Sequence, residues 1–221
     1  MFDAVIFDFD GLILDTETPL YEAWSLTFAA YGLDPIPLDR WATSLGRHDD
    51  DPLMLDPVQL LRTSLGRVVA VGEVQAVRRR HRDDLLDSLP IQPGVVTLLD
   101  EAEQCGVPVA IASSSPPDWI ERHLGPRGLL PRFATMACAG DGVPGKPDPA
   151  VYLDACRMIG ADPARSLALE DSPNGVTAAK SAEMICVAVP TALGRALDFT
   201  HADRVVDSLA HVTIAQLATD Y

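Results

Sequence analysis

Short apolar runs recur along the chain and alternate with segments that have the apolar spacing of helices. The runs cover residues 3–8, 107–113, 133–140, 166–171 and 184–189. Such runs are typical of strands buried on both faces of a parallel sheet, and the helical segments provide the crossovers that parallel strands need. The alternation predicts an α/β fold with a doubly wound, Rossmann-like parallel sheet. Ligands of such sheets bind at the carboxyl ends of the strands.

Residues 16–88 break this alternation. They contain three stretches of helical period and no convincing buried strand. We interpret them as an inserted α-helical cap domain, with the α/β core domain formed by residues 1–15 and 89–221. Pro90 and Pro93-Gly94 mark the return of the chain to the core.

The chain is acidic, with a net charge of −15 over 221 residues. This charge opposes binding to nucleic acid or to anionic membranes, since both require a basic surface. It would also repel a phosphorylated substrate unless a cation lies in the site. The first residues lack the basic segment of a signal peptide and are interrupted by acids, so we expect a cytoplasmic protein, with monomer or dimer left open.

Four cysteines are spread widely, without a closely spaced pair: Cys105, Cys138, Cys156 and Cys186. This distribution predicts reduced thiols buried in the core rather than disulfides or a zinc site.

Two acids follow the first apolar run. Asp8 and Asp10 are two residues apart, so their carboxylates should project to the same side, and Gly11 allows a sharp turn. Two neighbouring carboxylates repel each other, and a divalent cation makes their ionised state favourable. Taken alone, the pair fits a solvated turn or a helix cap equally well.

A second acidic pair, Glu170-Asp171, ends the run 166–171. Four acids at one sheet edge require a metal. Because all these ligands are oxygens, Mg²⁺ is the natural choice. The competing interpretation is that Asp171 or Ser172 only caps the following helix.

Two further elements suit a phosphate group. Ser113 and Ser114 lie at a strand end before a helical segment, where hydroxyl and backbone N–H groups can hold phosphate oxygens, although a structural turn fits equally well. Lys146 stands between Gly145 and Pro147. Arginine fills nearly all of the 17 basic positions and lysine occurs only at 146 and 180, which indicates a need for a compact ammonium at Lys146.

Together these elements resemble, in order and spacing, the four signature motifs of the haloacid dehalogenase (HAD) superfamily, in its β-phosphoglucomutase-like, phosphoglycolate-phosphatase-like branch with a helical cap. The residues that carry the resemblance are Asp8-Phe9-Asp10-Gly11, Ser113, Lys146 and Glu170-Asp171. Residues 1–14 and 90–190 match the pattern closely. The insertion matches in position, length and its opening Asp15-Thr16-Glu17.

The resemblance implies a Mg²⁺-dependent aspartyl-phosphate mechanism. Asp8 would be the nucleophile and Asp10 the general acid and base. Asp8, the backbone carbonyl of Asp10 and Asp171 would hold Mg²⁺, with Glu170 beside them. Ser113, Ser114 and Lys146 would bind the phosphoryl oxygens, and the substrate would be a small phosphorylated metabolite such as a sugar phosphate.

Relatives with other chemistries differ at identifiable residues. Dehalogenases of this fold lack the second aspartate, so Asp10 favours phosphoryl transfer. Phosphonatases use a cap lysine, and residues 16–88 contain none. Sugar phosphomutases have a histidine where this chain has Leu20 and an arginine where it has Asp49. The comparison favours a phosphatase, with a phosphomutase as the alternative.

The residues of the insertion 16–88 give fewer predictions about function than the residues of the core. Glu17, at the cap hinge, is a candidate for contact with substrate or water. Arg47 is a candidate substitute for the mutase arginine, but only after a shift of register. The basic run 78–82 is interpreted as the solvated face of a cap helix, and the acids after His48 as part of a cap loop. A catalytically silent binding protein or a polyanion-binding module fits poorly, because no catalytic group is missing and the net charge is negative.

Overall fold

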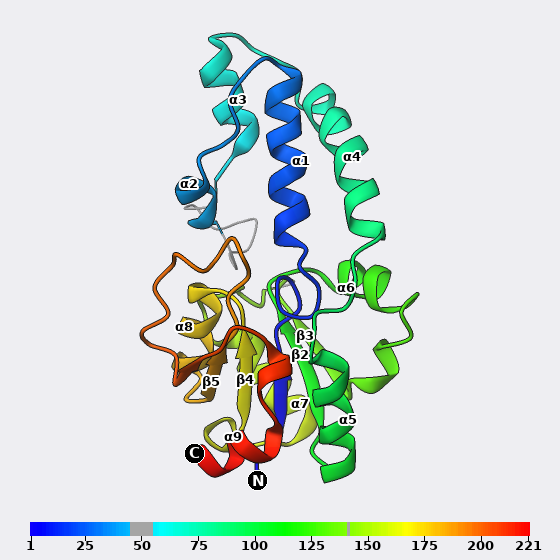
Figure 1. The fold of residues 1–221 in the computed structure, drawn as a ribbon, viewed down its shortest axis with the longest axis vertical. Coiled ribbons are helices and arrows are strands. Elements are labelled where there is room, and N and C mark those ends of the chain that lie inside the picture. Colours follow the sequence, from blue (N-terminus) through cyan, green and yellow to red (C-terminus); the bar gives the residue numbers. More distant parts are fainter. Residues whose placement is uncertain (45–54, 141) are drawn as a thin grey trace.

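The computed structural model describes residues 1–44, 55–140 and 142–221, and these contain a single six-stranded sheet (Figure 1). All the strand pairs are parallel, and the strand order is β3-β2-β1-β4-β5-β6. The strands are β1 (Val5–Phe7), β2 (Val109–Ser113), β3 (Thr135–Cys138), β4 (Leu167–Glu170), β5 (Ile185–Ala188) and β6 (Arg204–Val205). The predicted fold class is therefore confirmed, and the five apolar runs contain β1 to β5. The edge strand β6 was not predicted, because two residues leave no apolar run to recognise.

The two faces of the sheet differ in side-chain size. Along β1, Val5 and Phe7 join one apolar cluster and Ile6 joins the other, as the period of a strand requires. Large side chains fill the first face, which is covered by α5 (Val95–Cys105), α6 (Pro117–Leu124) and α9 (Ile214–Asp220). The second face is rich in alanine and is covered by α7 (Ala150–Ile159) and α8 (Pro173–Ser181).

Four helices lie at one end of the molecule, beyond the carboxyl ends of the strands (Figure 1). They are α1 (Glu17–Ala30), α2 (Leu38–Ala42), α3 (Pro57–Leu65) and α4 (Val71–Asp87). They have an apolar cluster of their own, built around Trp24, Trp41 and Leu61. The described residues between 16 and 88 contain no strand, as expected. The division of the chain into core and cap domains stays a prediction.

Three short 3-10 turns complete the described elements, at Leu130–Arg132, Pro163–Arg165 and Leu209–His211. All four cysteines are free. Cys156 and Cys186 are buried, as predicted, and Cys138 is partly buried, but the prediction is wrong for Cys105, which is exposed at the end of α5. Across the described ranges, no helix combines the length and apolarity required to cross a membrane.

Candidate active site

The candidate site lies where the direction of the strand crossovers reverses. Strand β1 is flanked by β2 on one side and β4 on the other, so the carboxyl ends of these three strands meet in one crevice. Asp8 follows β1, Ser113 ends β2 and Asp171 follows β4. A cavity of about 650 Å³ opens here, and its walls include residues from the strand ends and from α1, α2 and α4.

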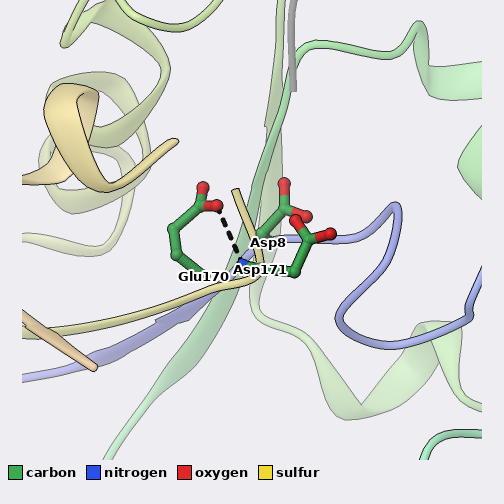
Figure 2. A group of neighbouring side chains, drawn as sticks. All are labelled: Asp8, Glu170 and Asp171. Atoms are coloured by element: carbon green, nitrogen blue, oxygen red, sulfur yellow. Dashed lines mark hydrogen bonds between the residues drawn. The ribbon is translucent and has the colours of Figure 1, made fainter. Parts of the chain in front are cut away.

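Three buried carboxylates meet at these strand ends. One oxygen each of Asp8, Glu170 and Asp171 lies within 4.8 Å of the others, and Figure 2 shows all three side chains projecting to the same side. Burial raises the pKa of Asp8 to about 8, against the opposing effect of Lys146 and with the help of Glu170. Burial, Asp8 and Glu170 raise the pKa of Asp171 well above its ordinary value. The ionised cluster therefore calls for more positive charge than Lys146 supplies.

Lys146 joins two of these acids. Its Nζ donates to Asp8 Oδ1 and, at 2.6 Å, to Glu170 Oε1. Burial alone would lower the pKa of Lys146, but the two carboxylates raise it above its ordinary value. The ammonium is therefore charged at every physiological pH and holds Asp8 and Glu170 in place.

The carboxylate oxygens of Glu170 accept hydrogen bonds from several further donors. The hydroxyl of Tyr152, from α7, donates to Oε1 at 2.5 Å, and the backbone N–H groups of Asp171 and Ser172 donate to Oε2 at 3.1 and 3.4 Å. Ser172 also caps α8 by accepting a hydrogen bond from the Gly175 N–H. The capping interpretation thus holds for Ser172, whereas Asp171 faces Asp8. Tyr152 was not predicted, because a tyrosine at helical spacing has the sequence signal of a core residue.

The turn after β1 packs directly against Asp171. Gly11 has a φ of +92°, and a Cβ at this position would lie 1.9 Å from Asp171 Oδ2. Only glycine allows both the left-handed backbone and this close approach. Gly11 therefore positions Asp10 next to the acidic cluster while leaving room for the Asp171 carboxylate.

Asp10 is held by three side-chain donors outside the carboxylate cluster. Thr16 Oγ1 and Trp119 Nε1 donate to its Oδ1 at 2.7 and 2.8 Å, and Ser115 Oγ donates to its Oδ2 at 2.6 Å. Both carboxylate oxygens are thus fixed on the wall of the cavity. Ser115 and Trp119 were not predicted as site residues, since their role depends on contacts more than a hundred residues apart in sequence.

The serine turn and the lysine loop lie together. Ser113, Ser114 and Lys146 all line the cavity. The hydroxyl of buried Ser113 accepts from the Ser115 N–H at 3.0 Å, and that of Ser114 accepts from the Lys146 N–H at 3.1 Å. These contacts connect the end of β2 to the loop that carries Lys146.

Of the two predicted cap residues, one can be placed. Glu17 is the first residue of α1 and lines the cavity. Burial, with the charges of Asp10 and Asp8, raises the pKa of its carboxyl to about 8. Arg47 and the acids after His48 lie outside the described residues.

The sequence profile of a known enzyme family matches most of the chain. The haloacid dehalogenase-like hydrolase profile covers residues 2–183. The chain belongs to this hydrolase family. Among curated members, this hydrolase is 37% identical to YhcW of Bacillus subtilis over 217 residues, which is 98% of this chain and 96% of YhcW. It is 33% identical to hexitol phosphatase B of Escherichia coli over 188 residues, covering 85% of this hydrolase and 83% of that phosphatase.

A solved structure of the family shares the fold. The crystal structure of β-phosphoglucomutase from Clostridium difficile superposes with a TM-score of 0.75 at 24% identity, over 100% of this chain and 97% of that one. At this identity the similarity concerns the fold alone. The family match and the similarity to YhcW confirm the prediction that the chain is an enzyme of the HAD superfamily.

Proposed function

We propose that the chain is a Mg²⁺-dependent phosphatase that hydrolyses a small phosphorylated metabolite, such as a sugar phosphate, through an aspartyl-phosphate at Asp8. The observation that carries the proposal is that Asp8, Asp171 and Lys146 lie together at the carboxyl ends of the strands, with Asp10 held beside them. The single buried ammonium of Lys146 neutralises the charge of these carboxylates only in part. A site of this kind, completed by a metal ion, suits the transfer of a highly charged phosphoryl group.

The donor set fits a magnesium ion. The three clustered carboxylates offer only oxygen ligands, and among the described residues they form the one group of this kind. Asp8 and Asp171 would hold Mg²⁺ together with the backbone carbonyl of Asp10. Glu170, which already accepts from Lys146 and Tyr152, would lie beside them. When bound, Mg²⁺ would neutralise charge on the carboxylates and on the phosphate oxygens.

Asp8 would act as the nucleophile. Its carboxylate oxygen forms a bond to phosphorus as the bond between phosphorus and the leaving oxygen breaks, and Asp10 gives that oxygen a proton. In the second half-reaction, water attacks the phosphorus of the aspartyl-phosphate and gives its proton to Asp10. This releases inorganic phosphate and restores both carboxyl groups.

Ser113, Ser114 and Lys146 would bind the phosphoryl oxygens during both steps. Their shared position on the cavity wall supports this role. Glu17 would contact the substrate or the attacking water from the cap side. Residues 16–88 would form the cap that covers the site, and the partner would be a small molecule rather than nucleic acid or membrane.

Water is the proposed phosphoryl acceptor, rather than a second sugar hydroxyl. Leu20, which stands where the phosphomutases carry a histidine, lines the cavity and offers no polar group there. The name of hexitol phosphatase B supports the same choice.

The test is a screen for phosphate release from phosphorylated sugars, alcohols and acids in the presence of Mg²⁺. The parent should release phosphate from some of these compounds, EDTA should abolish the release, and excess Mg²⁺ should restore it. Asp8→Asn should lose activity by a factor of about a thousand or more. Asp3→Asn is a matched control, because Asp3 lies at the amino end of β1 and pairs with Arg165.

Failure of the parent on every compound, or equal release by Asp8→Asn, would refute the phosphatase mechanism. Indifference to EDTA would refute the metal. Faster conversion of β-glucose 1-phosphate to glucose 6-phosphate than release of phosphate, in the presence of a bisphosphate primer, would instead establish the mutase.

A further inference from the structure

Two arginines of the basic run 78–82 face the cavity rather than solvent. Arg78 and Arg82 line its wall, together with Gln75, whereas Arg79 and Arg80 are exposed. The three lining residues are spaced three and four apart on α4, so they share one face of that helix. The interpretation of the whole run as a solvated face is therefore wrong for Arg78 and Arg82.

Arg78 is set against an aromatic wall. Its guanidinium carbon lies 5.2 Å from the centre of the Trp24 ring, within the range of a cation–π contact. Trp24 belongs to α1, is buried and also lines the cavity. The contact between α1 and α4 thus fixes a positive charge at the wall of the cavity.

Arg82 lies one helical turn further along the same wall. Its Nε and Nη2 donate to Asp83 Oδ1 at 2.8 and 2.6 Å. The Asp83 side chain is 43% exposed, so water screens this pair and an incoming anion can compete for the arginine. The guanidinium also has a donor group, Nη1, on its other edge.

These charges are not needed for the phosphate that is transferred. That phosphate would lie beside Asp8, where Lys146 and a bound Mg²⁺ would supply the positive charge. Lys146, Arg78 and Arg82 are the cations among the described lining residues, in a chain whose net charge is −15. Two guanidiniums on one wall of a cavity with an acidic floor are suited to a second anion on the same ligand.

We propose that Arg78 and Arg82 bind a second anionic group of the substrate, a carboxylate or a second phosphate, while its first phosphate lies on Asp8. The substrate class is then a phosphomonoester whose body carries another negative charge. This inference rests on the proposed phosphatase function. The cavity, at about 650 Å³, has room for a metabolite of this kind.

The test compares substrates that differ in one charge. D-3-phosphoglycerate and sn-glycerol 3-phosphate differ in a carboxylate, and fructose 1,6-bisphosphate and fructose 6-phosphate differ in a second phosphate. For at least one pair, the parent should show a kcat/KM about tenfold or more higher for the more anionic member. The pair that shows the preference identifies the carboxylate or the phosphate as the second anion.

Arg78→Gln with Arg82→Gln should bring that ratio close to one. Arg79→Gln with Arg80→Gln is the matched control and should keep the ratio of the parent, because both side chains are exposed. The lysine variants Arg78→Lys and Arg82→Lys should keep part of the preference. If the double glutamine variant fails to fold, as thermal melting would reveal, Arg82→Gln alone should still lower the ratio.

A parent ratio near or below one for both pairs would overturn the inference and leave the phosphatase function standing. A preference that survives the loss of Arg78 and Arg82 would overturn it as well. No phosphate release from any compound of the phosphate-release screen, with these four and p-nitrophenyl phosphate included, would overturn the phosphatase function itself, and the inference with it.

Discussion

At the scale of single residues, the surroundings of Asp10 differ from those of Asp8. Asp8 contacts Lys146 within the buried cluster, whereas Asp10 accepts hydrogen bonds from Thr16, Ser115 and Trp119 on the cavity wall. Asp8 therefore has the environment of a nucleophile beside a cation, and Asp10 that of a carboxyl group fixed towards the substrate. This separation of environments underlies the two roles proposed for the pair.

Trp119→Phe tests the role of the indole N–H as a group that positions Asp10. An aromatic side chain is kept but the hydrogen bond to Asp10 is lost, so proton donation to the leaving oxygen should be slower. For an alkyl phosphate, kcat/KM should fall by a factor of roughly ten to a hundred. For p-nitrophenyl phosphate it should change little, because nitrophenolate leaves without a proton. An equal loss on both substrates, or a large drop in melting temperature, would indicate a purely structural role.

The sequence predicts the residues whose chemistry is unusual for their setting. Lys146 was identified because lysine is rare in this chain, and Asp8 and Asp171 because acids ended apolar runs. Trp119 and Tyr152 were not identified. Their functional atoms are single donors on side chains that are otherwise ordinary core residues, and the acceptor of Trp119 lies 109 positions away.

At the scale of elements, apolar period and capping residues account for most of what could be predicted. Helix α3 begins where Asp56 accepts from the Gln59 N–H at 3.0 Å and Pro57 follows, a strong start signal. Helix α2 has five residues and no side-chain cap, and it was not predicted. The sequence also does not indicate which face of α4 lines the cavity, because arginines occur both on the exposed face and on the cavity-lining face.

The turn between β1 and α1 shows how an element depends on one residue. Gly11 was predicted to allow a sharp turn, and its φ of +92° agrees with that expectation. Its contact with Asp171 could not be predicted, because Asp171 belongs to another strand end. The backbone preference of Gly11 could therefore be predicted from the sequence, whereas the packing of its turn against the loop of Asp171 could not.

At the scale of the whole molecule, several of the acids that make the chain negative are gathered at the active site, where their pKa values are raised. Asp8 and Glu17 have pKa values raised to about 8, chiefly by burial, and the pKa of Asp171 is also raised. These groups hold protons in the folded chain at pH values where the unfolded chain has lost them. Their contribution to stability is therefore present at low pH and is lost as the pH rises towards 8. Lys146 stays charged throughout this range.

Stability should therefore respond to Mg²⁺ in a pH-dependent way. Because Mg²⁺ binds the ionised carboxylates and not the protonated ones, its addition should raise the melting temperature more at pH 8 than at pH 5. The measurement is thermal melting in EDTA and in excess Mg²⁺ at both pH values, with KCl matched to the ionic strength of the magnesium buffer. An equal increase at the two pH values would contradict the assignment of the cluster as a metal site.

In the proposed mechanism, Asp8 carries the phosphoryl group between the two half-reactions. This role is tested most directly by mass spectrometry of the Asp10→Asn variant after rapid mixing with p-nitrophenyl phosphate, whose leaving group needs no proton from Asp10, followed by acid quenching and peptide mapping. Asp10→Asn removes the base that activates water, so the adduct should accumulate. One phosphoryl group is expected on the peptide that contains Asp8, and none in Asp8→Asn. Phosphate release by Asp8→Asn at the parent rate, or an adduct on another residue, would contradict the proposed mechanism.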